Sequence, residues 1–315
     1  MSLAALALLV ALSGVARAET TKLVYALPVA LPAVIPYVAI DMGFFREEGL
    51  EVEPRMFSSG REALQALLAG QAQIQSVSET PVALAILQGN SIVTVATAAR
   101  HHEAKLIVRP ESGIAKPEDL AGKRVATLPG TNSDYFMDEF LAAHGLKRGQ
   151  LKVANMPPPQ MVAAYVAKDL DGFFAWEPHV QYALDAVPGS TVYPAGNLYS
   201  GWMTVNMDPA FVKANPGTTR KILRALIKAE AFVKAHKEES FRLVAARLKM
   251  DEKVLRALWD QNRYQVELDK GLPELMTKVG RWARAQEKSS KPLPNFRESI
   301  DDAPLRAERP KSVSL

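Results

Sequence analysis

Hydrophobic and polar positions follow two different periods along the first two thirds of the chain. Short apolar runs of strand length, such as residues 23–27 and 92–98, are separated by segments with the 3.6-residue spacing of helices, such as residues 61–69. Helical segments begin at prolines or small polar residues and end at glycine, as the segment 134–144 ends at Gly145. This order predicts strand–helix units around mostly parallel sheets, which is an α/β fold.

The other predicted elements complete two series of such units and a helical end. Further strands are expected at residues 51–57, 74–77, 123–128, 151–155 and 172–175, and further helices at residues 32–45, 82–88 and 160–168. From Asn215 onward the pattern changes to helices alone, with further starts at Asp251 and Pro273. The tail beyond Lys288 is rich in Pro, Ser and charge, and we expect it to lie on the surface or to be partly disordered.

The two series of units predict two lobes. No low-complexity linker separates them, so strands are expected to cross between the lobes near residues 106–109 and 195–201 and to form a hinge. The expected division is a first lobe at residues 19–106, a second lobe at 107–198, a helical return to the first lobe at 199–288 and a tail at 289–315.

The N-terminal segment has features of a secretory signal. An apolar run at residues 3–15 leads into Ala16-Arg17-Ala18, the small-x-small pattern that signal peptidase accepts. We expect removal of residues 1–18 and a free periplasmic protein, because the run is shorter than a membrane helix and the sequence has no cysteine for a lipid anchor. No Lys or Arg precedes the run, which indicates a true start further upstream, unless the amino terminus alone supplies the charge.

Composition and missing motifs favour binding over catalysis. The formal net charge is +4, and basic residues are interleaved with acidic ones, so no nucleic-acid partner is expected. The sequence contains no dinucleotide fingerprint, Walker motif or nucleophile elbow, so no cofactor and no enzyme activity are predicted. Adjacent His101 and His102 lack the spacing of a metal site, so no metal is expected.

Three strand-to-helix turns carry small hydroxyl residues or glycine: Ser58-Ser59-Gly60, Ser78-Glu79-Thr80 and Thr131-Asn132-Ser133. Each turn points free N–H groups and the positive end of a helix dipole at the carboxyl edge of a sheet, where ligands of open α/β folds bind. One such turn is an ordinary helix cap. Three of them, shared between two lobes, indicate a cleft that receives an anion.

Trp176-Glu177-Pro178 follows the expected strand 172–175 and should lie at the same edge. The indole either contacts the ligand or fills the core beneath the loop, and both alternatives stay open. Glu79 and Glu177 would repel an anion, so they either accept bonds from an amine on the ligand or pair with a residue such as Arg100 and latch the lobes. The candidate ligand-binding residues are Ser59, Gly60, Glu79, Thr80, His102, Thr131, Asn132, Ser133, Trp176 and Glu177.

Several motifs resemble a known family across nearly the whole length after the signal. They are Gly43-Phe44-Phe45 with Gly49-Leu50, Leu68-Ala69-Gly70, the run Pro-Glu-Asp-Leu-Ala-Gly-Lys-Arg-Val at residues 117–125, Pro129-Gly130-Thr131 and Trp176-Glu177-Pro178. The chain is similar to the periplasmic binding proteins of sulfonate, taurine and nitrate uptake, which have the type II binding-protein fold and are called NMT1/THI5-like.

The resemblance implies a two-lobed, monomeric receptor that closes on one small anionic ligand and docks on an ABC transporter permease in the inner membrane. An alkanesulfonate or a taurine-like compound is the expected ligand. Nitrate, bicarbonate or an aromatic or pyrimidine compound are the alternatives. A sensor kinase could replace the permease as the partner. Enzymes of pyrimidine-precursor synthesis share the fold but are expected to need cysteine, which this chain lacks.

Two positions depart from the family pattern. Gln73 stands where an aspartate is common, and Asp134 stands where sulfonate receptors often have another residue. Asp134 is expected to put a carboxylate beside the anion site, which leaves the identity of the ligand open.

Overall fold

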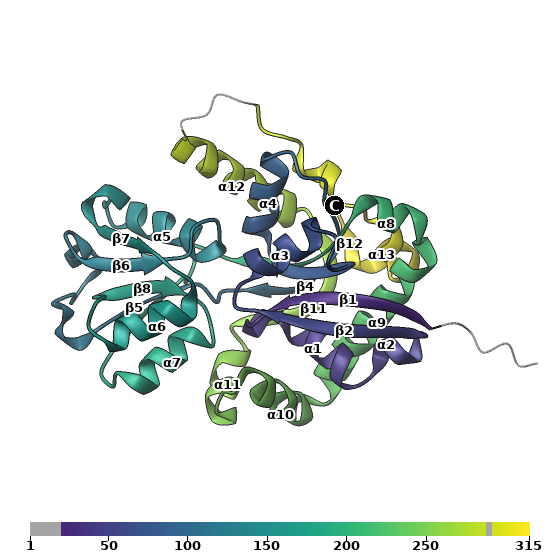
Figure 1. The fold of residues 1–315 in the computed structure, drawn as a ribbon, viewed down its shortest axis with the longest axis horizontal. Helices are drawn as coiled ribbons and strands as arrows, with labels where there is room; N and C mark the ends of the chain where they lie inside the picture. The colour runs from purple at the N-terminus through teal and green to yellow at the C-terminus, as the bar shows by residue number, and fades with distance from the viewer. Residues whose placement is uncertain (1–19, 288–291) are drawn as a thin grey trace, which may run out of the picture.

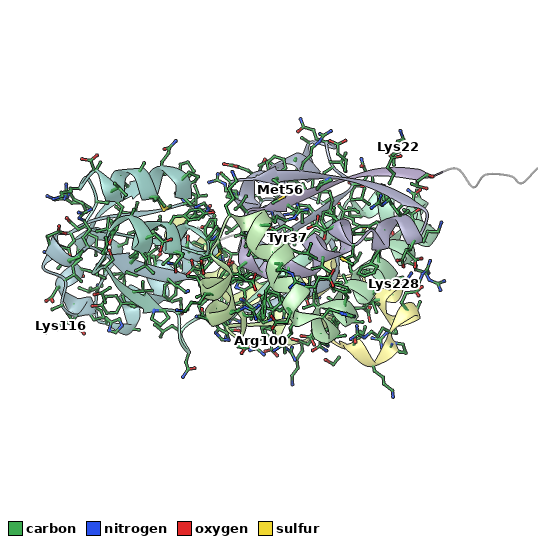
Figure 2. All side chains as sticks on the ribbon, turned by 90° about the horizontal axis from the view of Figure 1, so that it is seen from below. Lys22, Tyr37, Met56, Arg100, Lys116 and Lys228 are labelled. Atoms are coloured by element: carbon green, nitrogen blue, oxygen red, sulfur yellow. The ribbon has the colours of Figure 1, made fainter. Side chains whose placement is uncertain are left out.

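The computed structural model describes residues 20–287 and 292–315, so the expected signal segment lies outside the described residues. Two β-sheets form a large lobe and a small lobe, and Lys22 and Lys116 lie at opposite ends of the molecule (Figures 1 and 2). The two-lobed α/β architecture predicted from the sequence is confirmed.

Both sheets mix parallel and antiparallel strands. The large-lobe sheet has the order β12 (Val313–Ser314), β11 (Asn262–Asp269), β4 (Val93–His101), β10 (Gly201–Met207), β3 (Ile74–Ser78), β1 (Thr21–Pro28) and β2 (Leu50–Phe57). The small-lobe sheet has the order β7 (Lys152–Asn155), β6 (Arg124–Thr127), β8 (Gly172–Ala175), β5 (Lys105–Val108) and β9 (Thr191–Pro194). Pro54 is tolerated in β2 because this strand is at the edge of its sheet.

Helices cover both sheets (Figure 1). The large lobe carries α1 (Val34–Asp41), α2 (Phe44–Glu47), α3 (Gly60–Leu68), α4 (Glu79–Leu87), α8 (Pro209–Ala214), α9 (Pro216–Ala235), α10 (Lys237–Leu248), α11 (Glu252–Trp259), α12 (Gly271–Glu287) and α13 (Ala303–Glu308). The small lobe carries α5 (Asn132–Ala143), α6 (Pro158–Val166) and α7 (His179–Ala186). The predicted single helix at 32–45 is divided, because Gly43 adopts a left-handed conformation with φ 75° between α1 and α2.

The prediction of helices alone after Asn215 is wrong. β11 pairs antiparallel with β4 inside the large-lobe sheet, and its alternating Tyr264, Val266 and Leu268 are buried. The tail also differs from the expectation of partial disorder over its described residues 292–315. Phe296 and Leu305 are buried there, and β12 pairs with β11, because these apolar side chains have the large-lobe core to pack against.

The chain crosses between the sheets twice. It leaves the large-lobe sheet after His101 and enters the small-lobe sheet at Lys105, and it returns between Pro194 and Gly201. The first crossing therefore precedes residues 106–109, where the sequence pattern placed it, because β5 already pairs with β8 and β9 from Lys105 onward. Over the part of the chain that the structure describes, no helix has the length and apolar character needed to cross a membrane.

Candidate ligand-binding cleft

A small cavity lies between the two lobes, where the ends of β1 and β3 and the start of α3 face the start of α5 and the end of β8. Its volume is about 20 Å³, enough for about one water molecule. Twelve residues line it: Pro28, Ala30, Gly60, Arg61, Val77, Ser78, Pro81 and Met203 from the large lobe, Thr131, Asn132 and Trp176 from the small lobe, and Glu103 from the first crossing. Both lobes thus contribute residues to one site.

Thr131 and Asn132 bring the start of α5 to this cavity. Thr131 is the N-cap of α5, and its carbonyl accepts bonds from the N–H groups of Asp134 and Tyr135, so the helix leaves the N–H groups of Asn132 and Ser133 without an intrahelical partner. The Asn132 side chain is only 4% exposed, and its Nδ2 has no hydrogen-bond partner among residues 20–287 and 292–315. Buried donors at the positive end of a helix suit an anionic group.

Glu103 contributes a hydrogen-bond acceptor to the same cavity. Its side chain is buried, and its Oε2 has no hydrogen-bond partner within the described chain. Burial raises the pKa of the Glu103 carboxyl well above its usual value, and Glu177 raises this pKa further, whereas Lys105 and the nearby Asn132 side chain lower it. A free carboxyl oxygen in this position is available to a donor on a ligand. The sequence analysis missed Glu103 because it belongs to no motif.

Ser78 and His101 stand beside Glu103. The Oγ of Ser78 is 3.1 Å from Nε2 of His101, and Nδ1 of His101 is 3.9 Å from Oε1 of Glu103. This order of groups is that of a hydrolase triad. However, burial, with a smaller effect of neighbouring His102, lowers the pKa of His101 to about 3. An imidazole with so low a pKa is a weak general base at neutral pH.

Trp176 closes the cavity from the small lobe. Its indole is 3% exposed, and Nε1 donates across the cleft to the carbonyl of Val29 at 3.3 Å. The N–H of Leu31 donates to the carbonyl of Glu177 at 3.4 Å nearby. Both bonds join the lobes, so Trp176 contributes both a wall of the cavity and a contact that holds the lobes together.

Glu79 and Thr80 lie outside the cavity lining, and their side chains bond to protein groups. Oε1 of Glu79 accepts from the hydroxyls of Thr80 and Tyr199 at 2.7 and 2.8 Å, and Oε2 accepts from the N–H of Trp202 at 2.9 Å. Burial raises the pKa of Glu79, and these bonds oppose the rise. Glu79 therefore fixes the start of α4 to the second crossing and to β10.

Glu177 is also paired within the protein. Nζ of Lys105 donates to Oε1 of Glu177 at 2.6 Å, and both residues belong to the small lobe. The suggested pairing of Glu79 or Glu177 with Arg100 is wrong, because Arg100 contacts the second crossing and β10 of its own lobe. Nε of Arg100 donates to Ser200 Oγ at 3.0 Å, and the guanidinium lies 4.8 Å from the centre of the Trp202 ring.

The remaining candidates have local roles. Oγ of Ser59 caps α3 by accepting the Glu62 N–H at 3.2 Å, and Gly60 packs so tightly that a Cβ would lie 2.2 Å from Val77 Cγ2. His102 is exposed, with Nδ1 3.2 Å from the carbonyl of Tyr199. Ser133 is buried, and its Oγ lies 3.0 Å from Thr131 Oγ1. Of the ten candidates, the cavity is thus lined by Gly60, Thr131, Asn132 and Trp176.

Asp134 does not oppose an anion in the way that its position suggested. Its carboxylate accepts from Nη2 of Arg148 at 2.6 Å and from the N–H of Gly130 at 2.9 Å. Burial raises the pKa of Asp134, while Arg148 opposes the rise. The carboxylate lines a surface pocket next to α12, and its charge is offset there by Arg148.

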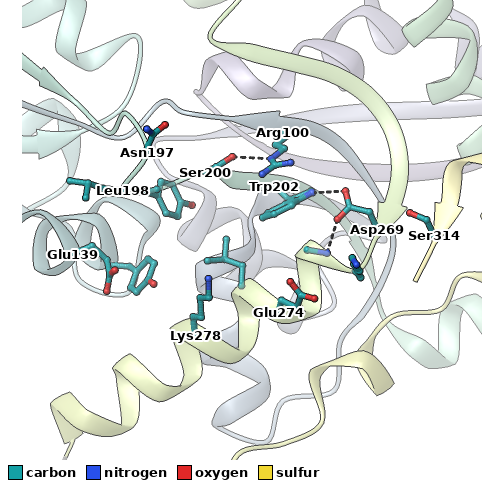
Figure 3. A pocket seen from close by; sticks show the side chains of 15 residues that line it. Arg100, Glu139, Asn197, Leu198, Ser200, Trp202, Asp269, Glu274, Lys278 and Ser314 are labelled. Atoms are coloured by element: carbon teal, nitrogen blue, oxygen red, sulfur yellow. Dashed lines mark hydrogen bonds between the residues drawn. The ribbon is translucent and has the colours of Figure 1, made fainter. Parts of the chain in front are cut away.

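A larger pocket of about 710 Å³ lies beside the second crossing (Figure 3). It is bounded by α5, the segment from Asn197 to Ser200 and the start of α12, and it contains side chains of both charges, such as Glu139 and Lys278. No group of three His, Asp or Glu side chains among the described residues is arranged to hold a metal ion.

Two sheets joined by two crossings, with a site between the lobes, form the architecture of the periplasmic binding-protein fold. A solved alkanesulfonate-binding protein, SsuA from Xanthomonas axonopodis pv. citri bound to MOPS, has this fold, with a TM-score of 0.79, 18% identity and coverage of 91% of this chain and 100% of that one. The family model described as NMT1/THI5 like matches residues 33–240, so the chain belongs to this family.

Among curated relatives, the taurine-binding periplasmic protein of Escherichia coli is 34% identical over 140 residues, which are 44% of this chain and 43% of that protein. The matched part is thus less than half of that relative's length. The fold also occurs in an enzyme, the desulfurization enzyme DSZB, with a TM-score of 0.67 at 15% identity, covering 92% of this chain and 99% of that one. The fold alone therefore does not separate receptors from enzymes.

Proposed function

We propose that this protein is the periplasmic ligand-binding component of an ABC importer and that its ligand is a sulfonate bearing an amine, such as taurine. The observation that carries the proposal is a buried donor and a buried acceptor on one cavity, Nδ2 of Asn132 and Oε2 of Glu103, which lie near each other and have no regular hydrogen bond within the described chain. The first is a donor at a helix N-terminus and suits sulfonate oxygens, and the second is an acceptor and suits an ammonium group.

Other features support a receptor that closes on its ligand. The cavity has room for about one water molecule, so a ligand of the size of taurine can enter only when the lobes move apart. The two crossings, at residues 102–104 and 195–200, provide the hinge. A receptor role without turnover agrees with the low pKa of His101, which makes the neighbouring Ser78 a poor nucleophile.

A ligand panel tests this function. Purified protein is heated with taurine, with ethanesulfonate, with β-alanine or with nitrate, and the midpoint of unfolding is followed. Taurine at ~100 times its dissociation constant should add about 2.7 kcal/mol to the free energy of unfolding. Stabilisation by nitrate alone, or by β-alanine with both sulfonates inert, would contradict the sulfonate assignment.

Export and partner belong to the same proposal. We infer cleavage after Ala18, in residues outside the described ones, and docking of the loaded receptor on a membrane permease. The mass of the protein in a periplasmic extract should correspond to a chain that starts at Glu19. An uncleaved, membrane-bound species would contradict this processing.

A further inference from the structure

α12 connects the two lobes away from the ligand cavity. It packs on α4 and is thus part of the large lobe, but its C-terminal half reaches α5 of the small lobe. Nε1 of Trp282 and Nε2 of Gln286 donate to the same oxygen, Oδ2 of Asp138, at 2.8 and 2.6 Å. The Trp282 ring also meets the ring of Tyr135 edge to face, with 5.4 Å between centroids.

Asp138 is held firmly within its own lobe. Its other oxygen, Oδ1, accepts from Nε of Arg148 at 3.0 Å, and Nη2 of the same guanidinium bonds to Asp134. The Asp138 side chain is only 12% exposed. Bonds to an ionised, partly buried acceptor are stronger than bonds between neutral groups. The two donors from α12 therefore add to a carboxylate whose position is already fixed.

Helix α5 links the contact at Asp138 to the ligand cavity and to the second crossing. Asp138 lies six residues after Asn132 on α5, which is about 9 Å along a rigid helix whose start lines the cavity. Tyr135 contacts the Tyr199 ring in the second crossing, with 5.9 Å between centroids, and Tyr199 bonds to Glu79. A movement of α5 away from α12 would separate Asp138 from its two donors and would also disturb the contact between Tyr135 and Tyr199.

We propose that Trp282 and Gln286 with Asp138 form a clasp that stabilises the closed arrangement of the lobes and opens when the lobes separate. Asp138 is then a positioning residue, since it acts on the ligand only through the placement of α5. The clasp goes beyond the proposed function, because it sets the balance between open and closed forms whatever the ligand is. The test of the clasp by ligand binding rests on the proposed function, whereas the test by lobe position does not.

Two substitutions weaken the clasp with little loss of packing. Trp282→Phe removes the N–H donor and keeps a ring against Tyr135. Gln286→Glu places a carboxylate against the carboxylate of Asp138. Gln160→Glu is the matched control, because Gln160 is an exposed glutamine on α6 of the small lobe. All variants should unfold cooperatively with circular-dichroism spectra like that of the parent.

Lobe position is measured first without ligand. Since the sequence has no cysteine, spin labels can be placed at cysteines introduced for Lys22 and Lys116, at the two ends of the molecule (Figure 2). The double variant Trp282→Phe/Gln286→Glu should show a changed and broader distance distribution, while Gln160→Glu keeps that of the parent. An unchanged distribution in the double variant would overturn the clasp, whether or not any sulfonate binds.

Binding kinetics give the second readout, with taurine as the probe. The double variant should release taurine about tenfold faster with nearly the same association rate, because the clasp contributes after encounter. A loss confined to the association rate, or the same loss in Gln160→Glu, would overturn the proposal. If taurine binds neither parent nor variants, the proposed ligand is wrong and the distance measurement alone decides on the clasp.

Discussion

Glu103→Gln tests how the cleft recognises an amine. The substitution keeps the size of the side chain and a carbonyl oxygen at the cavity, but it removes the negative charge. We expect taurine to bind more weakly, because a neutral amide cannot pair with an ammonium group in a buried site. Ethanesulfonate, which lacks the amine, should bind equally well to the parent and the variant.

The size of the effect follows from the burial of Glu103. Disrupting one partner of a buried, hydrogen-bonded charge pair costs about 2–5 kcal/mol. The raised pKa of Glu103 means that the ligand-free protein favours the protonated form, so ionisation on binding uses part of that energy. We therefore expect a loss in the lower part of the range, about 2–3 kcal/mol. This loss corresponds to a dissociation constant for taurine that is roughly 30- to 150-fold larger.

The pH dependence has a definite sign. Below the raised pKa of Glu103 the ligand-free carboxyl holds a proton that an ammonium ligand must displace, so taurine affinity should increase as pH rises toward that pKa. The titratable groups around Glu103 are Tyr37, Glu79, His101, Lys105, Glu177, Tyr199 and Tyr264. These groups remain in the Gln variant, so the pH dependence that is lost there is the part that requires the Glu103 carboxyl, including its coupling to them.

Isothermal titration calorimetry with taurine and ethanesulfonate, at several pH values and in two buffers, measures both affinity and proton release. Glu53→Gln is the control, because Glu53 is an exposed glutamate on the edge strand β2. Equal weakening of both ligands by Glu103→Gln would mean that Glu103 shapes the site without contacting the amine. No weakening of taurine would refute the assignment.

Three further changes test the packing that supports the site. Gly60→Ala should lower the free energy of unfolding by about 1–3 kcal/mol in thermal melts, because the new Cβ would clash with Val77, and an unchanged midpoint would contradict this close approach. Glu79→Ala should cost about 3 kcal/mol or more, since it leaves the Tyr199 hydroxyl and other buried donors unpaired; wild-type stability in urea unfolding would disprove that role. Removal of residues 303–315 should cost at least about 3 kcal/mol, because a buried leucine and β12 are lost, and a stable truncated protein would show the tail to be dispensable.

The sequence predicted the fold well where periodicity and turn signals agreed. The strand–helix units of both lobes follow directly from apolar spacing, prolines and glycines. The strand β11 was missed because it stands alone among helices, although Tyr264, Val266 and Leu268 alternate with polar residues. The break after α1 was missed because the pattern does not reveal the left-handed conformation of Gly43.

The candidate site was predicted in part, for physical reasons. Turns at the ends of strands carry a local signal, so Gly60, Thr131, Asn132 and Trp176 were placed near the cavity that they line. Glu103 carries no local signal, because its burial depends on how two lobes meet around a crossing segment. Tyr199 and Trp202, which bond to Glu79, are 120 and 123 residues away along the chain, and a single sequence does not show such contacts.

The order of strands in the large-lobe sheet has a consequence for how the chain folds. β10 pairs with both β3 and β4, and β11 and β12, from the last part of the chain, continue the sheet beyond β4. Pairings between segments so far apart in sequence, such as Asn206 with Thr94, raise the contact order and slow folding. During synthesis from the N-terminus, this sheet lacks an inner strand until β10 has emerged, so the large lobe can complete its fold only late, which is compatible with the export proposed above.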